Sequence, residues 1–162
     1  MHPLTVAQLL ILLTLANGSP VVAKLIFREH FSNPLDLGRK FIDGNPLLGP
    51  TKTIRGLLIA IVVTAASAPL LGLRLEIGLL VGATAMAGDL FSSFVKRRLR
   101  MPSSSKATGL DQIPEALFPL LACRVPLVLS ALDIVFACTI FFVGELLLSR
   151  LLFRLHIRDE PY

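Results

Sequence analysis

The chain has 162 residues, of which 54% are apolar and only 17% are charged, and its mean hydropathy is +0.74. In a soluble domain about a quarter of the residues are charged, so this composition excludes an ordinary soluble globular protein. The net charge is +5, but the sequence contains no zinc-ligand spacing and no nucleic-acid motif. Orientation in a membrane and contacts with anionic lipids or phosphates explain the charge without a nucleic-acid partner.

Apolar segments in chain order predict an all-α fold, a polytopic transmembrane helix bundle that forms one domain over residues 1–162. A helix of about 20 apolar residues crosses a bilayer. The segment 57–73 contains no charge, and 77–95 contains one, Asp89. The segment 134–153 is interrupted by Glu145 and by Arg150 near its end. We expect about five spans, at 4–27, 57–73, 77–95, 113–132 and 134–153.

The first and fourth of these segments are less regular than the others. Residues 4–27 contain Asn17-Gly18-Ser19-Pro20, which predicts a break or kink in the helix. A secretory signal peptide is an alternative for this segment, weakened because no basic residue precedes the apolar stretch. Residues 113–132 carry Glu115, Arg124 and two prolines, a pattern typical of a helix buried among others or of a half-inserted one.

Basic residues predict how the chain is oriented in the membrane. Thirteen of the sixteen Lys and Arg residues fall in 28–55, in 96–110 and at the end of the chain from Arg150. Short loops rich in Lys and Arg remain in the cytoplasm. We therefore expect cytoplasmic loops at 28–55 and 96–112, an N-terminus outside, a cytoplasmic C-terminus, and a functional site that faces the cytoplasm from the cell (inner) membrane. The oligomeric state stays open, with a homo-oligomer among the alternatives.

The first polar cluster lies within the predicted third span. Asp89, Ser92, Ser93 and Lys96 stand at i, i+3, i+4 and i+7, so they share one helix face. Small residues continue this stripe and allow close approach of a neighbouring helix, namely Gly78, Gly82 and Ala85. A carboxylate at this depth in a membrane usually faces a polar cavity with a partner or an ion. The alternative is a structural ion pair of Asp89 with Lys96 or Lys52.

The loop 28–55 contributes a second cluster. Gly and Pro residues near 43–50 let the backbone turn tightly close to a ligand. Lys52 and Arg55 supply charge that binds phosphate, and Thr53 supplies a hydroxyl group. A nucleotide-hydrolysing P-loop is disfavoured, since Gly49 and Lys52 are not adjacent and an uncharged apolar segment follows. The alternative is a flexible basic loop at a lipid headgroup surface.

A third cluster, Gly109-Leu110-Asp111-Gln112, follows the basic run that starts at Lys96. Asp111 brings a second carboxylate to the membrane edge near Asp89. Magnesium commonly binds one or two carboxylates together with substrate phosphates, while Lys and Arg bind the remaining phosphate oxygens. The three clusters thus favour phosphoryl or nucleotidyl transfer at the membrane surface. For Asp111, a simple helix cap is the alternative.

The segment from Gly88 to Leu99 closely resembles the signature of the CDP-archaeol synthase family, small relatives of phosphatidate cytidylyltransferase. The loop from Asp43 to Gly56 and the segment 110–112 are similar to further motifs of that family, in the same order. The resemblance implies a five-helix membrane enzyme that uses CTP and magnesium to convert a lipid phosphate into a CDP-lipid and pyrophosphate. No covalent enzyme intermediate is required, because the lipid phosphate attacks the α-phosphorus of CTP in line.

On this resemblance, Asp89 and Asp111 bind the magnesium ion, and Lys96 acts with them as a catalytic residue. Further residues are expected to bind CTP or its phosphates: Asp43, Asn45, Lys52, Thr53, Arg55, Ser92, Ser93, Arg97 and Gln112. The chain departs from the family pattern at 102–108 and at Ile113-Pro114-Glu115, where archaeal members usually have a hydrophobic residue followed by Asp. The lipid therefore stays open between an ether-linked archaeal phosphate, a diacyl phosphatidate and another polar lipid phosphate.

Two other classes of protein remain as alternatives. A small transporter for an anionic solute would also place Asp and basic groups inside a bundle, although it would more naturally show two similar halves with broken helices. A non-catalytic membrane scaffold would tolerate the joint neutralisation of Asp89, Lys96 and Asp111.

Overall fold

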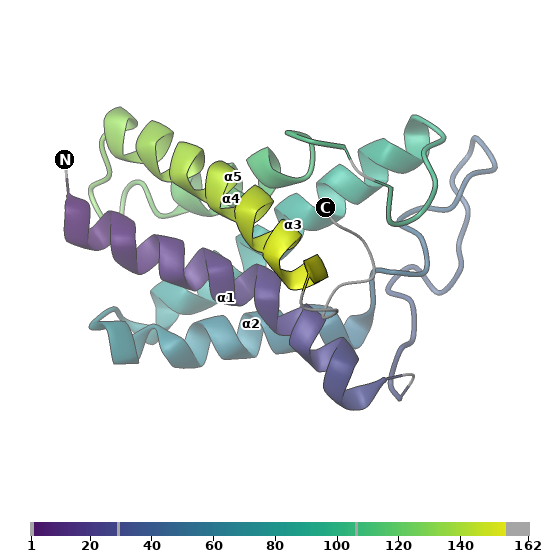
Figure 1. Ribbon diagram of the computed structural model, residues 1–162, viewed down its shortest axis with the longest axis horizontal. Helices are drawn as coiled ribbons and strands as arrows, with labels where there is room; N and C mark the ends of the chain where they lie inside the picture. Colours follow the sequence, from purple (N-terminus) through teal and green to yellow (C-terminus); the bar gives the residue numbers. More distant parts are fainter. Residues whose placement is uncertain (1, 29, 106, 155–162) are drawn as a thin grey trace.

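The computed structural model describes residues 2–28, 30–105 and 107–154, and its regular elements in these ranges are helices (Figure 1). In chain order they are α1 (Pro3–Phe27), α2 (Ile54–Ser67), the short 3-10 helix η1 (Pro69–Leu71), α3 (Leu75–Arg98), α4 (Gln112–Ala122) and α5 (Ala131–Arg154). Extended pairing among the described residues is limited to two isolated bridges, at Pro34 with Thr53 and at Lys40 with Pro46. The predicted all-α bundle is confirmed.

Four helices are long and apolar enough to cross a membrane. They are α1, the continuous stretch of α2 and η1 at Ile54–Leu71, α3, and the Ala131–Leu151 part of α5. Many large apolar side chains on these helices are exposed, among them Val22, Leu58, Leu79 and Val135. Lipid hydrocarbon is the environment that such side chains require, so the long helices match the predicted spans 4–27, 57–73, 77–95 and 134–153.

The fourth predicted span, 113–132, is not a full-length helix. The 11 residues of α4 extend about 16 Å, which is half of a ~30 Å hydrocarbon core. Turns occupy most of the stretch between Ala122 and Ala131. The start of α4 packs against Gly88 of α3, about 15 Å along that helix from Arg98, so the preceding loop enters the bundle before α4 begins. The segment is thus a short helix packed among the others, where a full-length span was predicted.

Helix α1 is continuous through the predicted breakpoint. Its 25 residues include Pro20 inside the helix, so of the break or kink predicted at residues 17–20, the break does not occur. Figure 1 shows instead that α1 changes direction toward its C-terminal part. On both sides of Pro20 the helix is packed against the bundle, since Ala16 and Ala23 are buried.

Small residues on α3 set the distance to α2. A Cβ atom at Gly78 would lie 2.6 Å from the backbone oxygen of Thr64, and one at Gly82 would lie 3.0 Å from the Cα atom of Ile61. Neither position can hold a larger side chain unless the two helices separate. The predicted close approach along this stripe is confirmed, and it makes α2 and α3 a tightly packed pair.

The two long loops lie at one end of the bundle. Figure 1 shows the loop before α2 and the loop after α3 together on the right, whereas the N-terminus and the start of α3 lie on the left. At the left end, Asp133 at the start of α5 accepts hydrogen bonds from the backbone nitrogen of His2 (2.9 Å) and from Ser130 Oγ (2.7 Å). The predicted cytoplasmic loops therefore share one side of the molecule.

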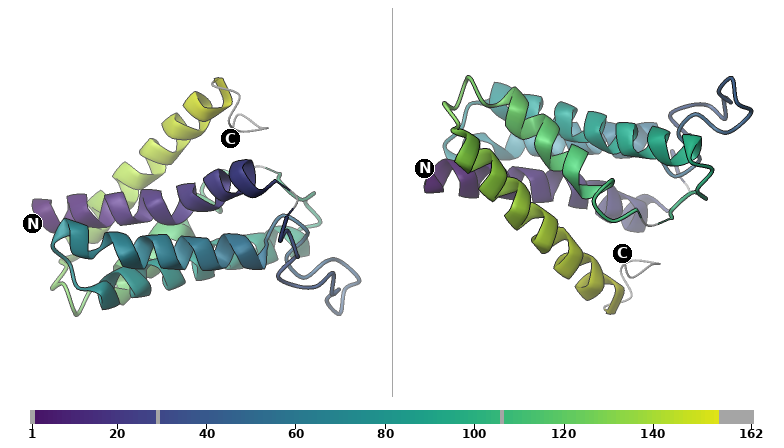
Figure 2. Two further views of the ribbon diagram at one scale, coloured as in Figure 1. Left: turned by 90° about the horizontal axis from the view of Figure 1, so that it is seen from below. Right: turned by 90° about the horizontal axis from the view of Figure 1, so that it is seen from above.

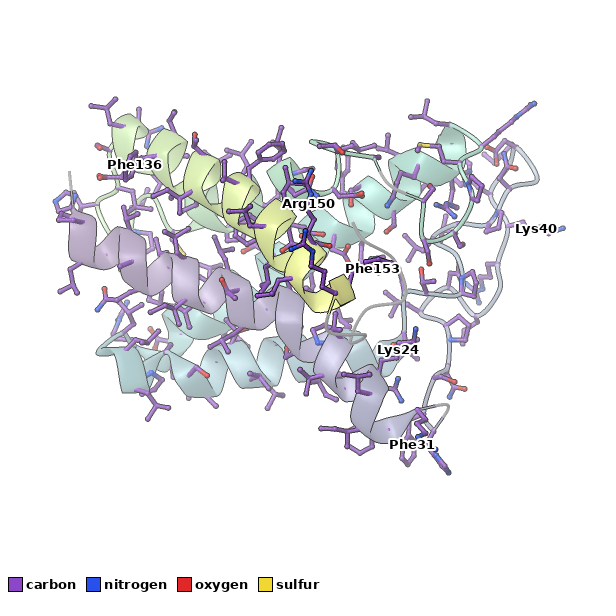
Figure 3. All side chains as sticks on the ribbon, in the orientation of Figure 1. Lys24, Phe31, Lys40, Phe136, Arg150 and Phe153 are labelled. Atoms are coloured by element: carbon purple, nitrogen blue, oxygen red, sulfur yellow. The ribbon has the colours of Figure 1, made fainter. Side chains whose placement is uncertain are left out.

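Basic side chains mark this loop-bearing end. In Figure 3, Lys40 projects from the first loop and Lys24 lies near the end of α1, while Phe136 is at the opposite end of α5. Figure 2 shows that α5 diverges from the other helices toward its C-terminal end, where Arg150 is found. Lys106 and Arg158, two of the thirteen basic residues, lie outside the described residues.

Candidate active site

Asp89 and Lys52 form the centre of the site. The Lys52 ammonium group donates to both carboxylate oxygens of Asp89, at 2.6 and 2.7 Å. Lys52 lies at the end of the first loop. The next residue, Thr53, caps α2 and so fixes where that helix begins, and the side chain of Lys52 extends to Asp89 on α3. The ion pair that the sequence offered as an alternative is present. Both partners of this ion pair are also predicted site residues. The pair is therefore compatible with a structural role and with a functional one.

Lys52 keeps its positive charge at this position. Burial disfavours the charged form, but the adjacent Asp89 carboxylate outweighs burial and raises the pKa of Lys52 above its usual value. Glu115 and Asp111 act on Lys52 in the same direction. Three carboxyl groups therefore lie within electrostatic reach of one ammonium group.

Asp111 has its own ammonium partner. Lys96 Nζ lies 2.6 Å from Asp111 Oδ1 and also donates to the backbone oxygen of Ser105 at 3.2 Å. The second oxygen, Asp111 Oδ2, accepts from the backbone nitrogen of Ala107 at 3.1 Å. Asp111 precedes α4 but makes no side-chain capping bond, so the simple-cap alternative does not describe its role.

Glu115 joins the site without having been predicted. A Cβ atom at Gly88 would lie 2.3 Å from the backbone oxygen of Pro114 and 2.8 Å from the backbone nitrogen of Glu115, so only glycine lets α4 begin here. This contact brings the Glu115 carboxyl group against Asp89, the residue after Gly88. Glu115 is 9% exposed. The sequence signal was available, namely an acidic residue in an otherwise apolar segment.

Arg97 lies at the edge of the cluster and holds the loop that follows α3. It is buried, and its guanidinium group donates to Ser103 Oγ and to the backbone oxygen of Pro102, both at 2.9 Å. Its Nε atom is buried without a hydrogen-bond partner. A Cβ atom at Gly49 would lie 2.7 Å from Ser103 Oγ, and Gly49 has a φ of +100°, so this glycine is required for contact between the loops.

Asp36 organises the first loop, and sequence reasoning did not single it out. Its carboxylate accepts hydrogen bonds from the backbone nitrogens of Gly38 (3.0 Å), Leu48 (2.9 Å) and Gly49 (2.9 Å). Burial opposes ionisation, but these three donors outweigh it and lower the pKa of Asp36 below its usual value. Asp36 thereby holds the loop segment that precedes Lys52.

Asp43 and Asn45 are not brought into contact with the central cluster. The Asp43 carboxylate accepts from Asn45 Nδ2 (3.0 Å) and from Arg98 Nη1 (2.8 Å). The Arg98 guanidinium group also stacks over Phe41 and Phe94, at 4.5 and 4.9 Å from the ring centroids. The hydrogen bond to Asn45 and the charge of Arg98 lower the pKa of Asp43. The described contacts of this pair tie the loop to the end of α3.

Thr53 and Arg55 also have structural contacts. Thr53 Oγ1 accepts from the backbone nitrogen of Gly56 at 3.1 Å and so caps α2. Arg55 Nη1 donates to the backbone oxygens of Arg28 and His30, which joins the end of α1 to the start of α2.

The remaining predicted residues lie close to the cluster but bond locally. Ser92 Oγ donates to the backbone oxygen of Asp89 at 2.9 Å, and Ser93 is buried one position further along α3. Gln112 Oε1 accepts from the backbone nitrogen of Gly109 at 2.9 Å. Of the twelve predicted residues, the structure thus gathers Lys52, Asp89, Lys96 and Asp111 in one cluster with Arg97 at its edge.

The donor set of the cluster suits a hard cation. Among the described residues, no three acidic, His or Cys side chains are arranged closely enough to enclose a metal ion by themselves. Carboxylates at Asp89 and Asp111 are the oxygen ligands that Mg²⁺ prefers, and magnesium usually completes its coordination with phosphates and water. Each carboxylate already carries an ammonium group at 2.6 Å, so each position favours a cation.

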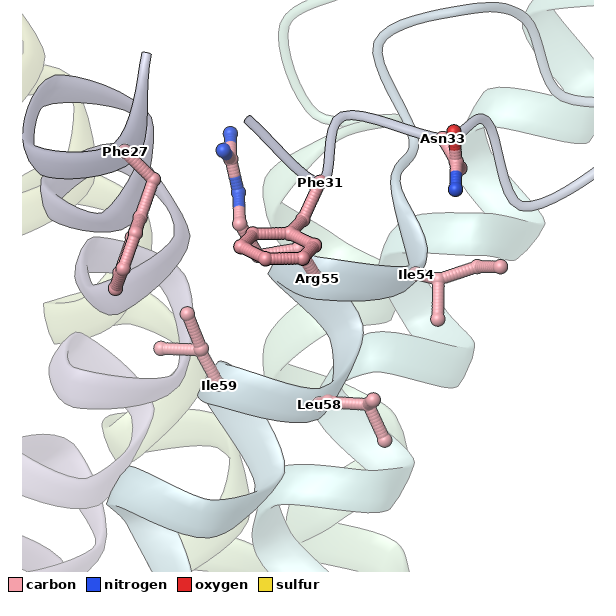
Figure 4. Close-up of a pocket in the computed structure, with 7 residues that line it drawn as sticks. All are labelled: Phe27, Phe31, Asn33, Ile54, Arg55, Leu58 and Ile59. Carbon is pink, nitrogen blue, oxygen red and sulfur yellow. The ribbon is translucent and has the colours of Figure 1, made fainter. Parts of the chain in front are cut away.

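An apolar pocket of about 360 Å³ opens beside this end of the bundle (Figure 4). It lies between the end of α1 and the start of α2. Its lining consists of Phe27, Phe31, Asn33, Ile54, Arg55, Leu58 and Ile59. Arg55 in the pocket is three residues along the chain from Lys52 in the charged cluster. The site therefore combines a charged cluster with a nearby apolar pocket.

Comparison with known proteins agrees with this geometry. Residues 9–162 match a family model described as CarS-like, CDP-archaeol synthase. A CDP-archaeol synthase of Pyrobaculum calidifontis is 40% identical over 72% of this chain and 75% of its own length. One from Sulfurisphaera tokodaii is 32% identical over 91% of this chain and 89% of its own length.

A solved structure shares the fold. It is described as an intramembrane enzyme for archaeal membrane lipid biosynthesis, and it superposes with a TM-score of 0.71 at 28% identity, covering 86% of this chain and 91% of the other. The family model spans α1 to α5 except the first residues of α1, and thus includes the whole charged cluster. The chain belongs to the CDP-archaeol synthase family, the CTP-dependent cytidylyltransferases of membrane lipid biosynthesis.

Proposed function

We propose that this protein transfers the cytidylyl group of CTP to a membrane lipid phosphate. A phosphate oxygen of the lipid attacks the α-phosphorus of CTP, the bond between the α-phosphorus and the bridging oxygen of the β-phosphate breaks, and pyrophosphate leaves. The observation that carries the proposal is the cluster of Lys52, Asp89, Lys96 and Asp111, four charged groups held together within a membrane-embedded bundle. Buried charges at membrane depth are costly and usually belong to a functional site.

No general base is needed for this reaction. A phosphate monoester has its second pKa near ~6, so the attacking oxygen is already anionic at neutral pH. Catalysis then depends on holding the two phosphates in line and on neutralising their charge. We assign the ammonium groups of Lys52 and Lys96 and the guanidinium group of Arg97 to the phosphate oxygens, and the carboxylates of Asp89 and Asp111 to Mg²⁺.

Asp89 and Asp111 would hold a magnesium ion, which would supply positive charge to offset the charge that develops on the leaving pyrophosphate. In the protein, the side chains of Lys52 and Lys96 would change partner from a carboxylate to a phosphate. Each lysine that pairs with a carboxylate would become available for a phosphate if that carboxylate held a metal cation. The geometry supports this exchange because both pairs link a flexible lysine side chain to an aspartate on a different segment.

The apolar pocket suits the lipid part of the substrate. We propose that a hydrocarbon chain of the lipid occupies the apolar pocket beside Arg55, with its phosphate directed to Lys52. An ether-linked archaeal lipid phosphate is favoured over diacyl phosphatidate, because the similar proteins bear the name CDP-archaeol synthase. The site opens to the cytoplasm, where CTP is found and where loops rich in Lys and Arg remain.

The test is pyrophosphate release by the purified protein in detergent, with CTP, Mg²⁺ and a panel of ether-linked and diacyl lipid phosphates. We expect release that requires CTP, metal and one class of lipid. Asp89→Asn should reduce the rate about a hundredfold or more, because it removes one of the two carboxylates that we assign to Mg²⁺. The matched control is Glu76→Gln, an exposed acid at the opposite end of α3 that pairs with Arg74 at 3.2 Å.

Two outcomes would overturn the proposal. Folded protein that releases no pyrophosphate with any lipid of the panel would favour a transporter or a scaffold. An Asp89→Asn variant as active as Glu76→Gln would show that the charged cluster is not the reaction site.

A further inference from the structure

We infer that the hairpin formed by residues 36–47 of the first loop binds the surface of the membrane. Leu37 and Ile42 enter the lipid layer, and Arg39 and Lys40 contact anionic lipid headgroups. None of these four side chains belongs to the charged cluster. The contact is therefore independent of the reaction proposed above and concerns how the first loop lies on the bilayer.

The backbone of the hairpin is held by its own hydrogen bonds. The nitrogens of Phe41 and Leu47 donate across it to the oxygens of Asn45 (2.8 Å) and Arg39 (2.9 Å). The turn at the tip is closed by a bond from the nitrogen of Gly44 to the oxygen of Phe41 at 2.9 Å, and Gly44 has a φ of +78°. The side chains of the hairpin therefore project from a defined backbone.

Two large apolar side chains of this hairpin are exposed. Ile42 at the tip is 95% exposed. Leu37 is 67% exposed and has a φ of +50°, in the left-handed region that favours glycine. Packing on the described residues covers little of either side chain, so neither gains much of the stabilisation that apolar burial provides. Lipid at the membrane surface would cover both and provide that stabilisation.

The hairpin is fastened to the helix end that emerges from the bilayer. The 24 residues of α3 extend about 36 Å, more than a ~30 Å hydrocarbon core, so the helix ends among the lipid headgroups. Its last residue, Arg98, donates to Asp43 at 2.8 Å and to the backbone oxygen of Pro46. The ring centroids of Phe41 and Phe94 are 5.4 Å apart. Figure 1 shows that the first loop extends past the end of α3, and hence to headgroup level.

The charge of the hairpin favours an anionic surface. Arg39 and Lys40 are exposed, and Figure 3 shows Lys40 projecting away from the bundle. The two acidic residues of the hairpin have partners within the protein, because Asp36 binds backbone nitrogens and Asp43 binds Arg98. The outward charge is therefore positive. Basic residues beside exposed apolar side chains are typical of segments that bind anionic membrane surfaces.

The experiment places a fluorophore at the tip of the hairpin. In the full chain with Cys123 and Cys138 replaced by Ala, Ile42→Cys is labelled with bimane and reconstituted into nanodiscs that contain a doxyl-quencher lipid. One set of nanodiscs holds phosphatidylcholine, and the other holds equal parts of phosphatidylcholine and phosphatidylglycerol. We expect the ratio of quenched to unquenched label to be at least about fivefold higher with phosphatidylglycerol, and to fall at high salt.

Lys40→Gln and Arg100→Gln form a matched pair in the labelled protein. Both remove one exposed positive charge from the loop-bearing end, but Arg100 follows α3 and lies outside the hairpin. Lys40→Gln should lower the quenched-to-unquenched ratio about fivefold, the contribution of one basic residue near an anionic surface. Arg100→Gln should change it less than about twofold. Thermal unfolding in detergent checks the fold of each variant, and Leu37→Cys provides a second label position.

Three results would overturn the inference. Label that stays unquenched in both sets of nanodiscs would place the hairpin in water and favour a protein partner. Quenching that is the same with and without phosphatidylglycerol would show that anionic headgroups are not bound. Equal losses with Lys40→Gln and Arg100→Gln would show a general effect of charge. None of these results bears on the proposed function, because the measurement contains no CTP.

Discussion

Lys52 neutralises a carboxylate that would otherwise be buried in the bundle without a counter-charge. Breaking a buried ion pair by removing one partner costs about 3–5 kcal/mol, because the remaining charge is uncompensated. We therefore expect Lys52→Met to lower thermal stability in detergent, and Mg²⁺ without nucleotide to restore much of the loss by taking the vacated place beside Asp89. Thermal unfolding with and without MgCl₂ measures this.

The unaltered protein serves as the control for that prediction. Its Asp89 already holds an ammonium group at 2.6 Å, so Mg²⁺ alone should change its unfolding temperature little. Equal stabilisation of both proteins by Mg²⁺ would contradict the exchange of lysine for metal.

Asp36 predicts a pH dependence of stability. Its pKa is lowered in the folded state by three backbone donors, so the ionised carboxylate stabilises the fold fully above the unfolded pKa near about 3.9. That stabilisation is lost as the pH falls through the lower folded pKa. Asp36→Asn should cost about 1–3 kcal/mol at neutral pH, because the N–H groups of Leu48 and Gly49 lose an ionised acceptor.

The measurement is the difference in unfolding temperature between the unaltered protein and Asp36→Asn from pH 7 to pH 3. The difference should be constant near neutrality and should narrow below about pH 4. A difference that is independent of pH would show that the carboxylate contributes through its shape and not its charge.

The residues of the site differ in how readily they can be predicted from the sequence. Asp89, Lys96 and Asp111 stand out because a charge beside an apolar segment needs a partner or a ligand. Asp36 does not, because its donors at Leu48 and Gly49 come from residues 12 and 13 positions later in a loop. Glu115 lies inside a segment long enough to be read as a span, and its neighbour Asp89 is on another helix.

At the scale of elements, the contact between α3 and α4 determines whether the site can form. Gly88→Ala would place a Cβ atom 2.3 Å from the backbone oxygen of Pro114, and backbone cannot move aside as a side chain can. We expect α4 to shift away from α3, a cost of about 1–3 kcal/mol, and activity to fall because Glu115 leaves Asp89 and the preceding Asp111 moves with it. Pyrophosphate release and thermal unfolding measure the two effects.

Gly144→Ala on α5 is the matched control, because a Cβ atom there would meet no heavy atom within 4 Å among the described residues. It should be stable and active. If Gly88→Ala were equally active, the close approach of α4 would not matter for the reaction.

The elements also show where prediction from the sequence ends. Four long helices follow from apolar length alone, since about 20 apolar residues must cross the membrane as a helix. The half-length of α4 does not follow, because it depends on a loop that enters the bundle and on the space that Gly88 leaves. Pro20 indicated a break or kink in α1 from local geometry, whereas the helix is continuous there and is packed on both sides of the proline, at Ala16 and Ala23.

For the whole molecule, the placement of basic loops at one end predicts its orientation in the cell. With Cys123 and Cys138 replaced by Ala, a single cysteine at Leu70 should react with a membrane-impermeant maleimide in intact cells. Leu70 is 86% exposed at the end opposite the loops. A cysteine at Lys40, on the first loop, should react only after the membrane is opened. The reverse pattern would place the site outside.

The half-length of α4 has an electrical consequence. Asp89 lies about 13 Å along α3 from Arg98, so an ion that reaches it from the loop-bearing end has travelled part of the way across the bilayer. In an energised membrane, a charge gains or loses about 2.3 kcal/mol for each 100 mV that it traverses. We therefore expect the affinity for an anionic nucleotide to vary with the voltage across the membrane, with a sign that indicates the side from which the nucleotide enters.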